Sequence, residues 1–560
     1  MMKKVLFVLL ALTLVLSACG PAAAPAEEAA PVEEEAAPVE EEAAPAEEEA
    51  APAEEEEEAA PAEEEVMEEA NTEIVVAMVG IPYQLDPLAS SSLEAAMIWE
   101  SMWDSLFYMN EETLEMEYYV ATDSSISEDG LTWTYTLRED VYFHDGVQLT
   151  AEDVKYSLDR MRDESLAFTG NTQYLNSIMN VDHVDVIDEF TVAVTTTQTV
   201  PALAYSLEEV MIQPKHYYES MDRETAAAAD PLGSGPYIFE EFILDQELSM
   251  VANADYWNGA PEVTKATFRM IPEPSTAAAE LATGGADLLQ MVPSSKYEEI
   301  RAMDNAEMVV VPGGCRVVYT FNHADPRFAD KEVRQAMNYS VDWDAVNDAF
   351  YNGAVPRMPI NVNPPWTNED LVAYPYDMAK VDELMTSVGW AKNDDGFWAK
   401  DDMLMEWTAM TYFDKASDTV EIMVAVADMF RQAGFNVTAE PLERSVALDK
   451  MDAHDIGPML YHRSCTSFEG EGDIHDLYST SSTNYGEWAN AEVDALIDEV
   501  GTSFDPVERG ELLDAAQAII FEEAAQVWLY RQPVAMGIGE RLDYTPPATG
   551  RIHLAEISFK

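Results

Sequence analysis

The sequence predicts an α/β fold with more than one lobe. Strand-like and helix-like segments alternate along most of its 560 residues, a length several times that of a usual domain. Hydrophobic residues make up 48% and aromatic residues 10% of the chain, so most of it can bury a core rather than stay disordered. We therefore expect several α/β units that follow an N-terminal segment of a different kind.

The first 18 residues have the pattern of a secretory signal peptide. Lys3 and Lys4 precede an apolar stretch over residues 5–16, which is shorter than the about 20 residues of a membrane-spanning helix. The next residues, Leu16-Ser17-Ala18-Cys19, resemble the lipobox of bacterial lipoproteins. The alternative is a chance cysteine after a signal peptide. The resemblance implies cleavage before Cys19, lipidation of its sulfur, and a protein held outside the cytoplasm on the outer face of the cell membrane by lipid only.

Residues 19–72 are expected to form a disordered tether. Residues 20–72 repeat Ala, Pro and Glu, and hold 21 Glu with no Lys or Arg. Such a segment buries too little apolar surface to offset its ordering entropy. A single Glu/Ala-rich helix is the alternative, which the recurring prolines disfavour: Pro25, Pro31, Pro38, Pro45, Pro52 and Pro61.

The net charge of the chain is −77 at pH 7, and most of it lies outside the tether. This charge makes nucleic acid and an anionic membrane surface unsuitable as direct partners. The charge indicates a soluble acidic surface and points to no activity by itself.

The cysteines and histidines predict no metal site. The chain has three cysteines, and Cys315 and Cys465 are left once Cys19 is assigned to lipid. They show no motif spacing, so two buried thiols are expected rather than a disulfide, which stays open as the alternative. The eight histidines show no ligand-like spacing with cysteine, and no cofactor is expected.

The body of the chain begins with a strand at residues 73–80, a loop, and an amphipathic helix within residues 93–107. Further strands are expected at residues 131–137, 191–196, 306–311 and 317–321. Helices are expected at residues 151–161, 331–339, 420–432, 491–501 and 506–524.

Residues 131–161, LTWTYTLREDVYFHDGVQLTAEDVKYSLDRM, carry a family resemblance. The block combines an alternating strand, a His144-Asp145-Gly146 turn, and a helix whose Thr150 and Asp153 are placed for a capping box. It resembles the family 5 extracytoplasmic solute-binding proteins, which include oligopeptide, dipeptide and nickel binders.

Five further motifs of this family follow in the family's order along residues 233–497. They are Gly233-Ser234-Gly235-Pro236-Tyr237, Asn253-Ala254-Asp255-Tyr256-Trp257, Phe321-Asn322 with residues 330–339, residues 376–390, and residues 484–497. The resemblance therefore covers nearly all of residues 73–560.

Catalytic motifs are absent from the sequence, and no enzymatic activity is expected. His144-Asp145 lies in a tight turn, which favours a loop role over half of a catalytic dyad. The chain holds no Gly-x-Ser-x-Gly elbow, no His-Glu-x-x-His pair and no phosphate-binding loop. The alternatives to a transport protein are a sensory binding protein without an importer and, less favoured, a cell-surface hydrolase.

The resemblance implies a two-lobed periplasmic-binding-protein-like (type II) fold with an extra subdomain in lobe one. It places lobe one at residues 73–321 with the subdomain at about 106–232, lobe two at 322–528, and a return to lobe one at 529–560. It implies capture of a peptide or other small solute in the interlobe cleft by hinge closure, delivery to ABC permease and ATPase subunits, and a monomer.

Dipeptide-binding relatives hold the amino group of the ligand with an Asp and its carboxylate with an Arg. Neither residue is clearly present at the matching positions of this sequence. The corresponding segments read LYHRSCTSFE at residues 460–469 and MTYFDK at residues 410–415. The candidate ligand-binding residues are Tyr83, Gly314, Arg316, Tyr412, Phe413, Lys415, Tyr461, Arg463, Phe468 and Glu469. Their rings and a lone Arg463 favour a longer peptide or a saccharide; alternatively, Glu469 and Lys415 take over the two charged roles.

Overall fold

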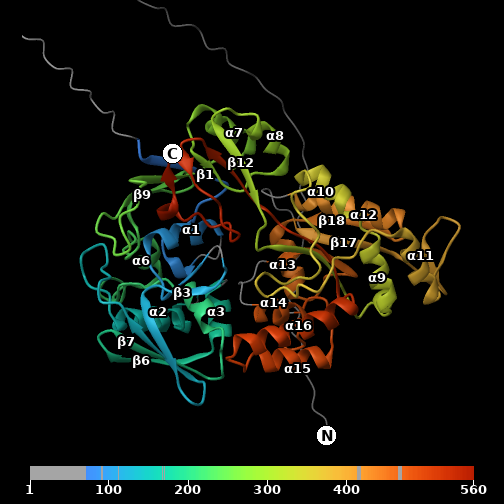
Figure 1. Cartoon of the computed structure of the whole chain (residues 1–560), viewed down its shortest axis with the longest axis horizontal. Helices are drawn as coiled ribbons and strands as arrows, with labels where there is room; N and C mark the ends of the chain where they lie inside the picture. The colour runs from blue at the N-terminus through green and yellow to red at the C-terminus, as the bar shows by residue number, and fades with distance from the viewer. Residues whose placement is uncertain are drawn as a thin grey trace, which may run out of the picture. The chain divides into compact units, whose positions relative to one another are not determined.

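The computed structural model describes residues 71–89, 93–110, 113–166, 168, 171–412, 418–464, 470–482 and 484–560. These residues form a mixed α/β fold with three large sheets (Figure 1). The expected signal peptide, Cys19 and the tether lie outside the described residues.

The largest sheet has seven strands in the order β12-β21-β11-β1-β10-β9-β8. Strand β1 lies inside it and pairs in parallel with β10 and β11. Ile74, Val76 and Met78 of β1 are buried because strands covered on both faces need apolar side chains. The strands are β1 (Glu73–Met78), β8 (Tyr237–Ile243), β9 (Glu247–Ala252), β10 (Lys265–Met270), β11 (Leu288–Leu289), β12 (Ala306–Val311) and β21 (Val534–Gly539).

A second sheet has five strands in the order β18-β17-β19-β13-β20. All six residues of β13 are buried, since β13 pairs on both edges and reads as a nearly continuous apolar run after Arg316. The strands are β13 (Arg316–Phe321), β17 (Glu406–Tyr412), β18 (Asn436–Leu442), β19 (Met459–Ser464) and β20 (Gln526–Arg531). In Figure 1, β17 and β18 run beside each other near α12.

The third large sheet is antiparallel, in the order β4-β5-β7-β6, and helix α2 packs on it (Figure 1). Its strands are β4 (Ala121–Ile126), β5 (Thr132–Leu137), β6 (Val181–Asp188) and β7 (Thr191–Thr196). The predicted alternation in β5 points Tyr135 and Leu137 into the core of this unit.

Small sheets complete the strand inventory. They are β2 (Phe107–Met109) with β3 (Met116–Tyr118), β14 (Ala391–Lys392) with β15 (Trp398–Lys400) and β16 (Met403–Leu404), and β22 (Leu542–Asp543) with β23 (Ser558–Phe559).

The helices expected at residues 151–161, 331–339, 420–432, 491–501 and 506–524 are present, with ends shifted by at most two residues, and the structure contains others that the sequence analysis did not predict. The described α-helices are α1 (Leu93–Met102), α2 (Ala151–Met161), α3 (Asn171–Met179), α4 (Leu203–Glu208), α5 (Lys215–Tyr218), α6 (Arg223–Ala228), α7 (Pro274–Thr283), α8 (Tyr297–Arg301), α9 (Lys331–Tyr339), α10 (Trp343–Tyr351), α11 (Met378–Ser387), α12 (Thr419–Gln432), α13 (Arg444–Asp452), α14 (Glu471–Tyr478), α15 (Ala491–Val500) and α16 (Pro506–Glu522). Within the described ranges, no helix has both the length and the apolarity needed to cross a bilayer.

The capping box predicted for α2 is present. The Asp153 carboxylate accepts a hydrogen bond from the Thr150 amide at 2.9 Å and from its hydroxyl at 3.0 Å. These bonds from Thr150 to the third residue of the helix fix its start where the sequence placed it.

Helix α1 ends at Met102, five residues before the end of the expected amphipathic stretch. The Gly233-Ser234-Gly235 loop packs directly on the end of this helix, where the Gly235 amide donates to the Met102 carbonyl at 2.9 Å. A Cβ atom added to Gly233 would lie 1.8 Å from that carbonyl oxygen, so this position accepts only glycine. The motif is therefore explained by a close approach of two backbones.

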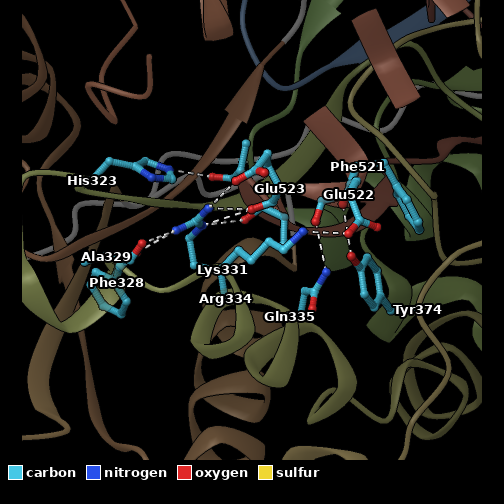
Figure 2. Close-up of polar contacts among 12 residues, drawn as sticks. His323, Phe328, Ala329, Lys331, Arg334, Gln335, Tyr374, Phe521, Glu522 and Glu523 are labelled. Atoms are coloured by element: carbon cyan, nitrogen blue, oxygen red, sulfur yellow. Dashed lines mark hydrogen bonds and ion pairs between the residues drawn. The ribbon is translucent and has the colours of Figure 1, made fainter. Parts of the chain in front are cut away.

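The Val333-Arg334-Gln335-Ala336 motif closes the C-terminal end of α16 (Figure 2). Arg334 donates to the carbonyls of Glu523 at 2.7 Å and of Phe328 at 2.7 Å, and Gln335 donates to the Glu522 carbonyl at 2.9 Å. These donors satisfy helix-end carbonyls that have no partner within the helix. The motif thus serves the packing of α9 against α16.

The chain passes twice between the seven-stranded and the five-stranded sheet. It crosses at residues 312–315, between β12 and β13, and returns at residues 532–533, between β20 and β21. Proline and glycine in Pro312-Gly313-Gly314 and Gln532-Pro533 interrupt the strands there. Two such crossings are what the predicted type II two-lobed fold requires, whereas the lobe boundaries at residues 321 and 528 remain predictions.

Candidate functional site

Three of the sequence motifs meet around the buried carboxylate of Asp104, just after α1. Tyr256 donates to Asp104 Oδ1 at 2.8 Å, Trp257 Nε1 donates to Oδ2 at 3.3 Å, and the Asp104 amide donates to Ser234 Oγ at 3.4 Å. The guanidinium of Arg138 lies 3.5 Å from the centre of the Trp257 ring. Burial raises the pKa of Asp104 to about 6, against the lowering effect of these hydrogen bonds. This cluster joins loops around a carboxylate that is only 1% exposed.

His144 of the predicted turn is also structural. Its Nε2 atom lies 3.0 Å from the Gly235 carbonyl, and its amide donates to the Gly233 carbonyl at 2.8 Å. Gly146 has a φ of 84°, as the tight turn requires. The neighbouring Asp145 contacts His216 at 2.8 Å instead of pairing with His144. The loop role expected for this motif agrees with these contacts.

The candidate ligand site is a pocket where the chain crosses between the two sheets. The empty space within it is about 650 Å³, part of which is open to solvent. Its walls come from both crossings, from the segment after β11, and from the C-terminal loop: residues 290–293, 313–315, 532–536 and 548–550, with Tyr297, Tyr351 and Asp418.

Asp418 is the one residue with a formally charged side chain among the described residues that line this pocket. Its carboxylate accepts hydrogen bonds from the Ser294 hydroxyl at 2.9 Å and from the Ser294 amide at 3.4 Å. Burial raises the pKa of Asp418, and the hydrogen bonds from Ser294 and Tyr351 only partly oppose this effect. Burial likewise raises the pKa values of Tyr297 and Tyr351 far above the usual range, so both phenols stay neutral.

Cys315 also lines the pocket, and it is disulfide-bonded. The expectation of two free buried thiols was therefore wrong for Cys315. Cys315 directly precedes β13, whose first residue Arg316 pairs with Ser464 of β19. Cys465 lies outside the described residues, so its pairing with Cys315 stays a prediction.

Of the predicted ligand residues, Gly314 lies in the pocket. Its amide donates to the Ala548 carbonyl at 2.9 Å, which attaches the C-terminal loop to the first crossing. Tyr83 does not line the pocket, and its side chain is 66% exposed in the loop after β1.

Arg316 lies behind the pocket, inside the protein. Its guanidinium is fully buried, forms an ion pair with Asp473 at 2.9 Å and donates to Asn361 Oδ1 at 2.7 Å. Burial raises the pKa of Asp473, although the charge of Arg316 opposes the rise. Such a pair holds β13 against α14 and leaves the guanidinium no exposed surface for a ligand.

The two predicted tyrosines of the five-stranded sheet are buried. Tyr461 is fully buried, and its ring packs 4.8 Å from that of Tyr319, measured between ring centres. Tyr412, at the end of β17, is 7% exposed and is not among the residues that line the pocket.

The remaining predicted residues cannot be placed at the pocket. The backbone of Arg463 pairs with Val317 in the five-stranded sheet, and its side chain lies outside the described residues. Phe413, Lys415, Phe468 and Glu469 also lie outside them. Their roles stay predictions.

Sequence reasoning missed most of the pocket, including Asp418, Tyr297 and Tyr351. The Pro-Gly and Gln-Pro breaks that mark the crossings were the available signal in the sequence. Asp418 precedes a helix, which in sequence has the appearance of an ordinary helix cap. Its position in a pocket wall depends on how α12 packs.

The lining of the pocket holds few ionisable groups. Its described walls are mainly apolar, with one carboxylate and two neutral phenols. They hold no histidine or lysine that could act as a base towards a nucleophile. Across the part of the chain that the structure describes, no group of three or more His, Cys, Asp or Glu residues is arranged to hold a metal ion.

Comparison with known proteins agrees with the order of the sequence motifs. Residues 115–485 match the family described as "Bacterial extracellular solute-binding proteins, family 5 Middle". The oligopeptide-binding protein AppA of Bacillus subtilis is 25% identical over 488 residues, which cover 84% of this chain and 88% of AppA. The glutathione-binding protein GsiB of Escherichia coli is 26% identical over 472 residues, which cover 81% of this chain and 88% of GsiB.

Solved structures show the same fold. AppA of B. subtilis in complex with a nonapeptide superposes with a TM-score of 0.70 at 22% identity, covering 87% of this chain and 99% of AppA. NikA of Brucella suis in complex with Fe(III)-EDTA gives a TM-score of 0.76 at 20% identity, covering 87% of this chain and 100% of NikA. Because the family match spans most of the chain and the motifs occur in the family's order, this chain belongs to family 5 of the bacterial extracellular solute-binding proteins.

Proposed function

We propose that this chain is the lipid-anchored solute-binding component of an ABC importer. It captures a peptide or another small solute between two lobes by hinge closure, outside the cytoplasm, and presents the closed form to the permease and ATPase subunits. The observation that carries this proposal is the pocket at the two crossings, because its walls come from both sides of the hinge.

The pocket couples ligand binding to the hinge. Residues 290–293 follow β11 of the seven-stranded sheet, whereas Asp418 precedes α12, which packs on the five-stranded sheet. A ligand that touches both walls gains its full contacts only when the two sheets are held close together. Binding therefore shifts the protein towards the closed form.

A second set of contacts bridges the four-stranded sheet and the loop between α15 and α16. The Phe504 ring lies 5.9 Å from the Trp133 ring of β5, and the Thr199 hydroxyl donates to the Gly501 carbonyl at 3.2 Å. Phe504 remains 40% exposed, so this contact is small and can open. The arrangement supports a hinge that closes without a large permanent interface.

The ligand is proposed to be larger than a free dipeptide. A buried charged terminus needs an opposite charge, and the Asp and Arg that serve dipeptide binders are not clear at the matching positions. Among relatives, AppA is named for oligopeptides and GsiB for glutathione, so ligands of several sizes fit proteins of this fold.

The binding role is tested by the molecules that co-purify with the exported protein. Mass spectrometry of the solute released on denaturation, and small-angle scattering of the protein with that solute, measure capture and closure. Ala548→Trp fills the pocket and should abolish both solute capture and compaction. Val372→Trp, at a position that is 78% exposed, is the matched control and should leave both unchanged. Capture and compaction that survive Ala548→Trp would place the ligand elsewhere.

The anchor is tested separately with Cys19→Ser. The variant should leave the washed membrane fraction and appear in the soluble extracytoplasmic fraction, because the acyl chains depend on that sulfur. Its retention in washed membranes would contradict the lipoprotein assignment without affecting the binding role.

A further inference from the structure

We propose that Phe504 and Trp133 form a latch, which holds the closed form of the protein together and sets how long a captured solute stays bound. Neither residue is among the described residues that line the pocket, so the latch acts on the closed form and not on the solute. This inference rests on the proposed solute-binding function and names the contact that controls the release of the solute.

The latch joins two parts of the chain that are far apart in sequence. Trp133 belongs to β5 of the four-stranded sheet, and Phe504 lies in the loop between α15 and α16 (Figure 1). Their ring centres are 5.9 Å apart, and the ring planes meet at 57°. Beside them, the Thr199 hydroxyl donates to the carbonyl of Gly501, the cap residue at the end of α15, at 3.2 Å. This bond reaches a helix-end carbonyl, which has no partner within its own helix.

The turn before β5 is shaped to receive the Phe504 ring. Gly130 has a φ of 72°, and its amide donates to the Ser127 carbonyl at 2.9 Å. A Cβ atom added to Gly130 would lie 3.1 Å from Phe504 Cε2 and 3.2 Å from the Thr199 methyl carbon. The ring therefore rests on bare backbone, where a larger residue in the turn would push it away.

The loop that carries Phe504 is held in shape by its own hydrogen bonds. The Ser503 hydroxyl donates to Glu508 at 2.6 Å, and Asp505 caps α16 by accepting from the Val507 amide at 2.9 Å. These bonds fix the backbone on both sides of Phe504, whose side chain stays 40% exposed. A ring presented from a fixed backbone loses little freedom when it docks on the facing sheet.

The size of the contact suits a latch that must open in each transport cycle. One aromatic pair shifts an equilibrium between undocked and docked forms by about 3–10-fold, and one neutral hydrogen bond adds a similar factor. The solute leaves only when the closed form opens, so removal of the latch should speed its release by the same factors.

The opposing interpretation is that the contact is a permanent part of the fold. In that case Phe504→Ala should lower the stability of the solute-free protein and leave the release of a bound solute unchanged. In the latch interpretation the variant releases solute faster, while the melting temperature of the solute-free protein stays within about 2 °C of the wild-type value. A larger fall with an unchanged release rate would overturn the latch.

The contact itself is tested by photo-cross-linking. The full chain is produced with Phe504→p-benzoylphenylalanine, irradiated together with its co-purified solute, and mapped by peptide mass spectrometry. We expect cross-links to the turn and strand at residues 127–133 and to the loop at residues 197–200. A protein that cross-links to neither segment would overturn the latch.

The release step is tested with a library of tripeptides that have free termini. Full-length protein is stripped by reversible unfolding, loaded with the library and diluted, and the retained peptides are measured over time by mass spectrometry. Phe504→Ala should release them at least about 3-fold faster, and its combination with Thr199→Val at least about 5-fold faster. The set of retained peptides should stay the same, because neither side chain lines the pocket.

Two variants serve as controls for the release step. Phe504→Tyr keeps the aromatic ring and should release the library at the wild-type rate. Val507→Ala removes a 69%-exposed apolar side chain from the start of α16 and should also leave the rate unchanged.

The outcomes separate the latch from solute binding. If wild type and Phe504→Ala release the tripeptides equally fast, solute capture stands and the latch is overturned. If the wild type retains no tripeptide, peptides are excluded as its solutes, and equal release of the co-purified solute by the two proteins overturns the latch. If no solute is bound in either measurement, both proposals are overturned.

Discussion

The buried ion pair between Arg316 and Asp473 gives the sharpest test of how this chain uses its charges. Arg316 was a candidate ligand residue by sequence, but the structure buries its guanidinium fully, 2.9 Å from a carboxylate that is equally buried. We expect Arg316→Met to destabilise the protein by about 3–5 kcal/mol, because it removes the guanidinium that forms an ion pair with the buried Asp473 carboxylate.

The magnitude follows from what remains after the substitution. Asp473 keeps a hydrogen bond from the Asn363 amide at 3.0 Å, and a hydrogen bond of this kind offsets only part of the desolvation cost of a carboxylate. Arg316→Met combined with Asp473→Asn removes both charges, and should recover at least about 2 kcal/mol relative to the sum of the single substitutions.

Urea unfolding followed by tryptophan fluorescence and by circular dichroism measures these differences, and coincidence of the two curves tests for a single transition. Solute affinity is measured on the same samples at a temperature where the variants are folded. A loss of stability below about 1 kcal/mol, together with a large loss of affinity, would refute the structural role and restore Arg316 as a ligand residue.

Three further predictions concern the Asp104 carboxylate, the disulfide of Cys315 and Gly233. The pKa of Asp104 is raised to about 6, so the stability that this group contributes is full below pH 4 and is lost as the pH rises through 6. Relative to wild type, Asp104→Asn should therefore gain about 3 kcal/mol between pH 4 and 7 in urea unfolding, and an unchanged difference over this range would contradict the raised pKa. Peptide mapping without reductant should find Cys315 linked to Cys465, and a free Cys315 thiol would contradict the bond. Gly233→Ala should lower the melting temperature strongly, since its Cβ would overlap the carbonyl oxygen at the end of α1; an unchanged value would show that the two backbones can separate.

Local features were predictable from the sequence because they depend on neighbours in the chain. The alternation of apolar residues placed β5, and the Thr150 and Asp153 pair placed the start of α2. Helix α9 begins and ends at the predicted residues. In each case, hydrogen bonds within a few residues and one buried face decide the structure.

Family membership was also determined by the sequence, through motifs whose physical roles are visible only in three dimensions. Gly233 allows a backbone contact with α1, and Arg334 closes the end of α16. These residues stabilise the fold at fixed places through contacts within the protein.

The candidate ligand site is formed by the tertiary structure. Its walls combine segments from residue 290 to residue 550, and no pattern in the sequence shows that they meet. Arg316 and Tyr461 have residue types typical of binding sites, yet packing buries both. Asp418 looks like a helix cap in sequence, and only the docking of α12 turns it into a pocket carboxylate. Burial and long-range contact set the chemistry of a charged group, and both arise from the fold as a whole.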